Sequence, residues 1–177
     1  MRTATPAPLP HSTDRLRLRG LREGDLQRIL DIYTHPRVRA LIGDHTLAEL
    51  REELDFWIAH QAAHGWSLWA LEELATGRLV GDCGLQPLEL RGPEVELSYD
   101  LSPHVWGRGY ATEAARATLS LAFGSFGIER VVAVVKSDHA ASRAVLERLG
   151  CTATGERTAY GERLLGYEIE ARRPLEL

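Results

Sequence analysis

Hydrophobic residues recur along this chain at two spacings, and each spacing predicts a type of secondary structure. Residues 15–19 alternate Leu with Arg, and residues 95–101 alternate apolar with polar positions, which is typical of strands with one buried face. Residues 131–135 are an almost continuous run of valine, which predicts a strand buried on both faces. Seven strands are expected, at residues 15–19, 66–71, 78–88, 95–101, 131–135, 151–158 and 162–169.

Other stretches repeat their apolar residues every three or four positions, as amphipathic helices do. A capping box of Thr46 and Glu49 marks the start of one such stretch, and Gly65 marks its end. Four helices are expected, at about residues 26–33, 46–65, 111–123 and 145–150. The resulting order β-α-α-β-β-β-α-β-α-β-β predicts an α/β fold in which helices cover a mixed sheet.

Length and composition indicate one globular domain. The chain has 177 residues, 44% of them hydrophobic and 26% charged, which is enough apolar material for a substantial core. Residues 1–10 are rich in Pro, Ala and Thr and lack the apolar centre of a signal peptide. We therefore expect a flexible tail over residues 1–12 and a single domain over residues 13–177.

Charge and cysteine content narrow the classes of partner. The net charge of −4 argues against a nucleic-acid partner, and no apolar run is long enough to cross a membrane. A cytoplasmic protein is the resulting expectation. The two cysteines, Cys83 and Cys151, form no C-x-x-C pair, which argues against a disulfide framework and against a zinc site.

The segment from Leu101 to Ala114, where a strand is followed by a helix, is the part of the sequence that indicates a binding site. Gly107 and Gly109 leave the backbone bare at the start of that helix. The first N–H groups of a helix have no internal partner and carry partial positive charge, so they form a seat for an anion such as phosphate. Thr112 stands where a dinucleotide fingerprint needs its third small residue, and no lysine follows as in a Walker loop.

Several motifs in order resemble the GNAT N-acetyltransferase superfamily, in particular its RimJ/RimL-like branch of ribosomal-protein N-terminal acetyltransferases. The motifs are Thr13–Arg19, Glu96–Pro103, Trp106–Ala114 and Ser142–Gly150. The resemblance implies the GNAT fold, a mixed and mostly antiparallel seven-stranded sheet with helices on both faces. It also implies a splay between the fourth and fifth strands, here residues 97–101 and 131–135.

The same resemblance implies an acetyl-CoA-dependent N-acetyltransferase that acts by direct attack of a primary amine, either a protein N-terminus or a small-molecule amine. No metal is required, and family members often form homodimers. An N–H near Asp100 or Leu101 would polarise the acetyl carbonyl. The cofactor-binding residues implied are Asp100, Leu101, Trp106, Gly107, Arg108, Gly109, Tyr110, Ala111, Thr112, His139 and Ser142.

Proton transfer requires a base for the amine and a hydroxyl near the sulfur, and each role has a candidate. Glu96 is the expected general base, with Asp100 as the alternative on the same face of the strand. That face is polar throughout, so a solvated face is the competing interpretation. Leu146 stands where many relatives carry a tyrosine, which leaves Ser142 as the group expected beside the departing sulfur.

Other residues are assigned to the acceptor or depart from the family pattern. The residues expected to touch the acceptor are Tyr33, Trp57, Tyr160 and Arg163. His139 replaces the asparagine of the branch's Asn-x-x-Ser pattern. With the missing tyrosine, that replacement keeps an alternative open, a non-catalytic acyl-CoA-binding sensor with the same fold. A binding module for another nucleotide is disfavoured by the incomplete glycine and lysine motifs.

Overall fold

The computed structural model describes residues 9–171, which form one eight-stranded sheet with five helices. The spatial order of the strands is β1-β2-β3-β4-β5-β6-β8-β7. The strands are β1 (His11–Ser12), β2 (Leu16–Gly20), β3 (Leu68–Glu73), β4 (Leu79–Pro87), β5 (Val95–Leu101), β6 (Arg130–Val135), β7 (Thr152–Ala159) and β8 (Glu162–Glu170). Neighbouring strands are antiparallel except β5 and β6, which run parallel.

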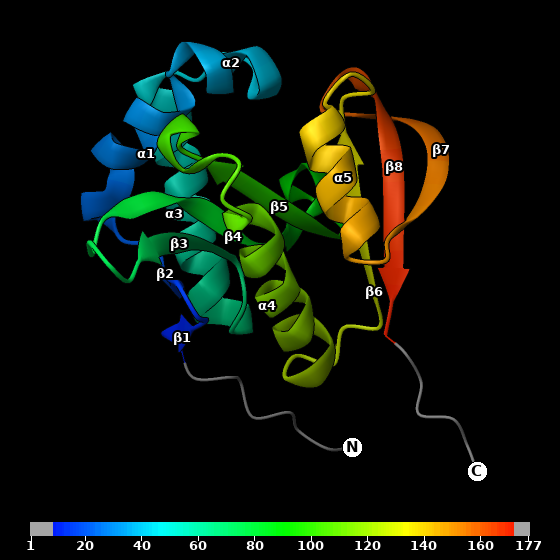
Figure 1. Cartoon of the computed structure of the whole chain (residues 1–177), viewed down its shortest axis with the longest axis horizontal. Helices are drawn as coiled ribbons and strands as arrows, with labels where there is room; N and C mark the ends of the chain where they lie inside the picture. Colours follow the sequence, from blue (N-terminus) through cyan, green and yellow to red (C-terminus); the bar gives the residue numbers. More distant parts are fainter. Residues whose placement is uncertain (1–8, 172–177) are drawn as a thin grey trace.

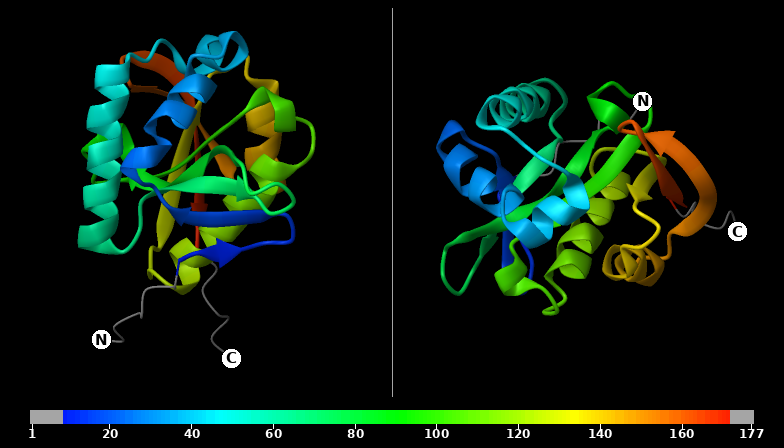
Figure 2. Two further views of the ribbon diagram at one scale, coloured as in Figure 1. Left: turned by 90° about the vertical axis from the view of Figure 1, so that its left-hand side faces the viewer. Right: turned by 90° about the horizontal axis from the view of Figure 1, so that it is seen from above.

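Helices cover both faces of the sheet (Figure 2). The helices are α1 (Leu26–Tyr33), α2 (Pro36–Ile42), α3 (Leu47–His64), α4 (Tyr110–Gly124) and α5 (Ala140–Arg148). One core cluster joins α4 to the sheet through small residues such as Ala114, Ala115 and Ala122, all fully buried. A second core cluster joins α1 and α3 to the opposite face. Each face therefore has its own hydrophobic layer, as a two-sided sheet requires.

The sheet parts in its middle, between β5 and β6 (Figure 1). The two strands share a single bridge, Glu96 opposite Val132. By contrast, β4 and β5 pair continuously from Pro87–Val95 to Gly81–Leu101. The backbone of β5 beyond Glu96 is thus paired on one side and free of a strand on the other. This is the splay that the sequence resemblance implies.

The structure adds two elements to the expected order, the two-residue strand β1 and helix α2. Helix α2 has only Val38 fully buried, so its hydrophobic periodicity is weak. The sequence marks α2 instead by the residues at its ends. Pro36 lies in its first turn and Gly43 follows its last turn, an arrangement typical of helices. Of the expected tail, His11 and Ser12 pair with β2, whereas residues 1–8 lie outside the described residues.

The capping chemistry predicted for the long helix α3 is confirmed. Thr46 Oγ1 accepts from the Glu49 N–H, and the Glu49 side chain accepts in return from the Thr46 N–H. Gly65 ends the helix in the left-handed conformation, with φ of 79°. Glu53 and Trp57 lie four residues apart and so share one face of α3, the face that looks toward the gap in the sheet.

Candidate active site

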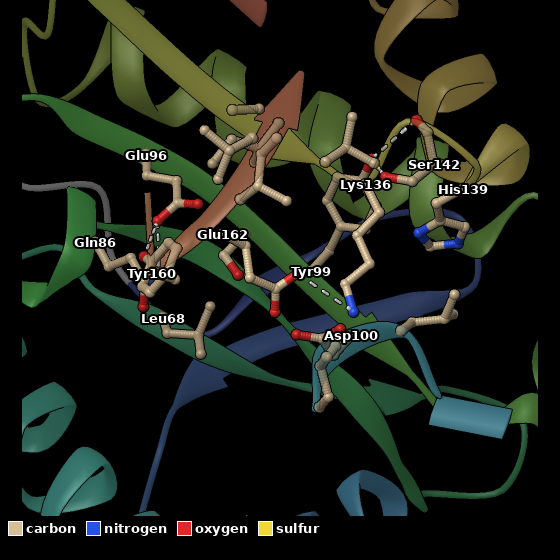
Figure 3. A pocket seen from close by; sticks show the side chains of 18 of the residues that line it. Leu68, Gln86, Glu96, Tyr99, Asp100, Lys136, His139, Ser142, Tyr160 and Glu162 are labelled. Carbon is tan, nitrogen blue, oxygen red and sulfur yellow. Dashed lines mark hydrogen bonds and ion pairs between the residues drawn. The ribbon is translucent and has the colours of Figure 1, made fainter. Parts of the chain in front are cut away.

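A cavity of about 310 Å³ lies where β5 and β6 part. Its lining comes from both halves of the sheet, from α1, α2, α3 and α5, and from the turn between β7 and β8. Figure 3 shows Glu96, Gln86 and Tyr160 grouped together, and Tyr99, Ser142 and His139 grouped apart from them. These two clusters of polar side chains lie apart and face the same cavity (Figure 3).

Strand β5 contributes side chains of both faces to this cavity because no neighbour covers its free edge. Glu96, Ser98 and Asp100 share one face, and Tyr99 projects from the other. Glu96 is only 4% exposed. The competing interpretation of a solvated polar face is therefore wrong, since this face lies in the cavity wall.

The backbone of β5 alternates in the direction of its hydrogen bonds. Ser102 N–H donates to Val80 O at 2.7 Å, and Leu88 N–H donates to Glu94 O at 2.9 Å. Hydrogen-bonded residues alternate in an antiparallel pair, so even-numbered residues of β5 turn their N–H groups toward β4. The N–H groups of Tyr99 and Leu101 consequently turn toward the gap.

This alternation corrects one of the expected backbone donors. The N–H of Asp100 is directed toward β4 and does not face the gap, because Asp100 pairs with Asp82 in register. Leu101 keeps its N–H on the gap side, while its carbonyl accepts from the Trp106 indole at 2.8 Å. The N–H of Tyr99 is a gap-facing donor that the sequence reasoning missed, and the period of two along the strand is the signal that identifies it.

Glu96 sits in a network of hydrogen bonds rather than in water. Its Oε2 accepts from the Tyr160 hydroxyl in a short contact and from Gln86 Nε2 at 3.1 Å. Burial raises the pKa of Glu96 to about 7, although the hydrogen bonds from Tyr160 and Gln86 partly oppose that shift. A carboxyl with this pKa can both take up and release a proton near neutral pH.

The same network contains two of the residues expected to touch the acceptor. Trp57 Nε1 donates to Gln86 Oε1 at 3.0 Å, and Gln86 Nε2 reaches the Tyr160 hydroxyl at 3.2 Å. Tyr160 occupies the β7–β8 turn with φ of 53°, and Glu89 Oε1 accepts from its N–H at 2.7 Å. Helix α3, strand β4 and the last hairpin thus meet at Glu96, three elements that are far apart in the sequence.

The second polar cluster faces the cavity from the α5 side. Ser142 Oγ lies 2.8 Å from the Tyr99 hydroxyl, which also donates to Ser142 O at 3.2 Å. Burial raises the pKa of Tyr99, so this phenol stays protonated at neutral pH. Leu146 lines the same region without a polar group. The hydroxyl that lies beside Ser142 comes from Tyr99 on strand β5, a residue the sequence analysis did not select.

His139 lies at the start of α5 and lines the cavity. No side-chain hydrogen bond caps the helix at this position. Burial lowers the pKa of His139 below its usual range, with Lys136 acting in the same direction and Asp138 against it. A neutral imidazole offers one donor and one acceptor, as the asparagine of the family pattern does.

A third group of polar residues, which we call the acidic end, consists of Tyr33, His45, Glu53, Asp82 and Asp100. Tyr33 donates its hydroxyl to Asp82 Oδ2 at 2.9 Å, and both side chains are buried. Asp82 lies opposite Asp100 in the β4–β5 register. Burial raises the pKa of Asp100 to about 6, and burial together with the charge of Asp100 raises the pKa of Asp82 well above its usual value.

The loop before α4 has the geometry of an anion seat. Gly107 and Gly109 have φ of 76° and 79°, in the left-handed region that favours glycine, and both are exposed. Within residues 9–171 no protein acceptor takes the N–H groups of Tyr110, Ala111 and Thr112. These free donors coincide with the positive end of a 15-residue helix.

Side chains around this loop hold it in place. Glu113 accepts from the Thr13 hydroxyl at 2.6 Å and from Arg15 Nε at 2.7 Å, and Arg15 Nη1 donates to Arg108 O at 2.8 Å. Arg108 itself is exposed and pairs with Glu73 at 3.3 Å. The chain start therefore clamps the loop, a role for Arg15 and Glu113 that the sequence analysis did not assign.

Of the residues expected to cradle the anion, Trp106 has no free N–H, and Tyr110 offers its N–H but not its side chain. The Trp106 N–H already donates to Pro103 O at 3.3 Å, so it is not one of the free donors. Arg37 stacks on the Trp106 ring at 4.5 Å. The Tyr110 side chain turns away from the loop and donates its hydroxyl to Glu73 at 2.7 Å. Trp106 thus contributes to the loop through its indole, and the free N–H groups belong to the residues after it.

Arg163 is a correction to the expected acceptor contacts. Its side chain is 78% exposed and pairs with Glu156 on the outer face of the last hairpin. Its neighbours Glu162 and Leu164 line the cavity instead. Successive side chains of a strand point to opposite faces, so an assignment off by one residue places the side chain on the wrong side.

Two residues of strand β4 are further site residues that the sequence analysis missed, Asp82 and Gln86. Both interrupt an otherwise apolar and buried strand. A polar residue in such a strand must find a partner, and this interruption is the sequence signal that points to them.

Metal and membrane sites find no support in the described part of the chain. Within residues 9–171 no group of three or more His, Cys, Asp or Glu side chains is arranged to hold a metal ion. None of the helices in that range has the length and apolar character needed to cross a membrane.

Comparison with known sequences identifies a domain that covers most of the chain. A family model described as the acetyltransferase (GNAT) domain matches residues 15–152. The uncharacterized protein YkkB of Bacillus subtilis is 31% identical over 78% of this chain and 82% of its own length. The uncharacterized N-acetyltransferase YoaA of the same organism is 27% identical over 84% of this chain and 85% of its own length.

Solved structures share the fold. An acetyltransferase from Agrobacterium tumefaciens superposes with a TM-score of 0.81 at 28% identity, covering 93% of this chain and 96% of the other. RimL, a ribosomal L7/L12 α-N-protein acetyltransferase solved with coenzyme A, gives a TM-score of 0.75 at 17% identity over 91% of this chain and 97% of its own. The mixed fold with helices on both faces, expected from the motifs, is confirmed.

Proposed function

The chain belongs to the GNAT family of acetyltransferases, and from that premise we propose that it transfers acetyl from acetyl-CoA to a primary amine bound beside Glu96. The observation that carries the proposal is the parting of β5 and β6 after one bridge, with Glu96 buried at the bridge. A carboxyl with a pKa near 7 at the closed end of such a gap has the position and proton affinity of a general base.

The residues present fit a CoA thioester. The free N–H groups of Tyr110, Ala111 and Thr112 suit its pyrophosphate, since backbone donors at a helix start bind such groups. The gap-side N–H groups of Tyr99 and Leu101 suit the amide-like arm and the acetyl carbonyl. Acetyl-CoA supplies the activated acyl group as a thioester, and in our proposal every other role falls to side chains of the chain.

In the proposed reaction the Tyr99 N–H holds the acetyl oxygen as negative charge develops on it. A donor in such a place contributes about 2.7–4 kcal/mol in other acyl-transfer sites. Glu96 takes the proton from the attacking amine, directly or through one water molecule. Tyr160 and Gln86 hold the Glu96 carboxylate in position through their hydrogen bonds to Oε2. The nitrogen–carbon bond forms as the carbon–sulfur bond breaks.

The thiolate leaves on the opposite face of β5. Ser142 and Tyr99 present a pair of hydroxyls there, 2.8 Å apart. Tyr99 can donate a proton to the sulfur while Ser142 fixes the orientation of its hydroxyl. Acid and base thus stand on opposite faces of one strand, which keeps the incoming amine and the departing thiol apart.

We assign the acceptor to the primary amines, with protein N-termini as one class and small-molecule amines as the other. The motifs of the RimJ/RimL-like branch and the structural likeness to RimL support the first class. The acidic end of the cavity supports a cationic acceptor of either class. The cytoplasmic location and the homodimer rest on the sequence alone and stay predictions.

The experiment that tests the proposal follows free-thiol release from acetyl-CoA over a panel of amines. The panel includes peptides that start with Ala or Ser, small monoamines and diamines. We expect acceptor-dependent thiol release in the wild-type protein and its loss in Glu96→Gln, with binding of CoA retained by both proteins. Binding of CoA without thiol release for any acceptor would support the sensor alternative instead.

A further inference from the structure

The acidic end of the cavity has no role in the proton transfers proposed above. Among its members Tyr33, His45, Glu53 and Asp100 line the cavity, and Asp82 lies beneath them on β4. Asp100 and Glu96 share one face of β5 four residues apart, which separates their Cα atoms by about 13 Å. One cavity therefore carries two carboxyl centres, and the gap-side N–H of Tyr99 lies between them along β5.

The carboxyl groups at this end lack compensating charge within the described chain. No arginine or lysine of residues 9–171 forms an ion pair with Glu53, Asp82 or Asp100, and His45 Nε2 lies 3.9 Å from Glu53. The cavity's lysine, Lys136, pairs with Glu162 at 3.6 Å. Three ionised carboxylates that are buried close together repel one another, and this repulsion costs free energy. Protonation or a bound cation removes that cost.

A separate observation is the unsatisfied carboxyl of Asp82. Its side chain is 1% exposed, and Oδ1 has no hydrogen-bond partner even though Oδ2 accepts from Tyr33. Asp82 lies directly opposite Asp100 in the β4–β5 register, so the two side chains project from the same face of the sheet. His45 Nδ1 is likewise buried without a partner. Buried polar atoms of native proteins are rarely left so, and a ligand is one way to satisfy them.

We infer that the acidic end binds a second cationic group of the acceptor, an ammonium or a guanidinium, while the amine that is acetylated lies nearer Glu96. This inference rests on the proposed function, because it assigns a substrate class to the same cavity. The described residues offer no arrangement that could ligate a metal ion. An organic cation instead donates hydrogen bonds to oxygens that are spread over several ångströms. The rings of Tyr33 and His45 also line this end of the cavity, where they contact each other edge to face with centroids 5.1 Å apart.

The test compares two ligands that share a five-carbon chain, 1,5-diaminopentane and 1-aminopentane, by calorimetric binding. We expect the wild-type protein to bind the diamine about tenfold or more tightly, because a charged hydrogen-bonding partner contributes on that order. Glu53→Gln and Asp82→Asn should each bring this ratio close to one. Glu52→Gln is the matched control, since Glu52 is the exposed neighbour of Glu53 on α3.

Turnover gives a second readout that separates cation binding from base catalysis. In Glu53→Gln, KM for the diamine should rise about tenfold or more with kcat little changed, and KM for 1-aminopentane should stay constant. An equal fall of kcat for both amines would overturn the inference, as would equal binding of both ligands by the wild-type protein. A diamine preference without any thiol release would uphold the cation site and refute the proposed function, so the two failures are distinguishable.

Discussion

At the scale of single residues, burial decides what Glu96 can do. On an exposed strand face this carboxylate would be ionised at any physiological pH. In the cavity wall its pKa rises to about 7, because desolvation outweighs the hydrogen bonds from Tyr160 and Gln86. The residue thereby gains the proton affinity that a general base for an ammonium substrate needs.

A pH profile tests this role. The base acts only when deprotonated, so kcat/KM should rise with pH and level off above about 7, the pKa of Glu96. Glu96→Gln should lower kcat/KM by about 100-fold or more, the usual range for loss of a general base. The variant should also lose the rise of kcat/KM with pH, the acidic limb of the profile. An acceptor whose own amine has a low pKa keeps substrate ionisation out of the profile. An unchanged limb in the variant would assign the proton uptake to another group, with Asp100 next in line.

The hydroxyl pair of Tyr99 and Ser142 yields a second residue-scale prediction. Tyr99→Phe should lower kcat about tenfold or more while KM for acetyl-CoA changes little, since the lost hydrogen bond acts on the departing sulfur. Ser142→Ala should give a smaller loss, because Tyr99 keeps its hydroxyl. An acetyl thioester with a more acidic thiol should narrow the difference between wild type and Tyr99→Phe. If both thioesters lose the same factor, the hydroxyl has a structural role.

At the scale of elements, the site depends on how closely β3, β4 and β5 approach one another. A Cβ at Gly84 would lie 2.3 Å from Ser67 O and 2.7 Å from Leu68 Cα, both backbone atoms. Strand β4 carries Asp82 and Gln86 on either side of this contact. The absence of a side chain at Gly84 therefore lets β3 and β4 approach closely between Asp82, which is buried, and Gln86, which lines the cavity.

The element-scale prediction follows from that contact. Gly84→Ala should lower the free energy of unfolding in urea by about 2 kcal/mol or more, since backbone has to move to admit the methyl group. Gly20→Ala is the control, because a Cβ at Gly20 meets nothing within 4 Å. Equal stability of the two variants would show that β3 and β4 can separate without cost.

At the scale of the whole molecule, two parts of one sheet meet along a weak seam. Strands β1 to β5 form one part and β6 to β8 the other, and the seam is the single bridge between Glu96 and Val132. Helix α4 packs on β4 and β5, whereas α5 lines the cavity from the side of β6. A molecule that inserts its backbone-like arm into the seam would complete the hydrogen bonding of the sheet.

Hydrogen exchange tests this view of the molecule. Saturating CoA should slow amide exchange most at Tyr99, Leu101 and the first turn of α4, with little change in β2 and β3. At 100 times its Kd the ligand should also stabilise the fold by about 2.7 kcal/mol. Protection spread evenly over the sheet would contradict binding in the seam.

The sequence by itself determined much of this protein. Hydrophobic patterns located seven of the eight strands and four of the five helices. Alternation and a period of about 3.6 residues show which face of an element is buried, and the continuous run at residues 131–135 marks a strand buried on both faces. The glycines before α4 and the Thr46–Glu49 capping box could be recognised in the sequence because each acts on backbone only a few residues away. Glu96 could be selected because it lies on the strand that leads into the glycine loop.

Tertiary structure decided what depends on neighbours distant in the sequence. The grouping of Trp57, Gln86 and Tyr160 around Glu96 joins residues up to 103 positions apart, and no local pattern encodes that meeting. The same is true of Tyr99 beside Ser142 and of Asp82 opposite Asp100. Arg163 shows what the sequence pattern leaves undecided, because on a strand the residue next to one that lines the cavity points to solvent. Burial and the pKa values that follow from it belong to the assembled fold, since they depend on every element that excludes water from the site.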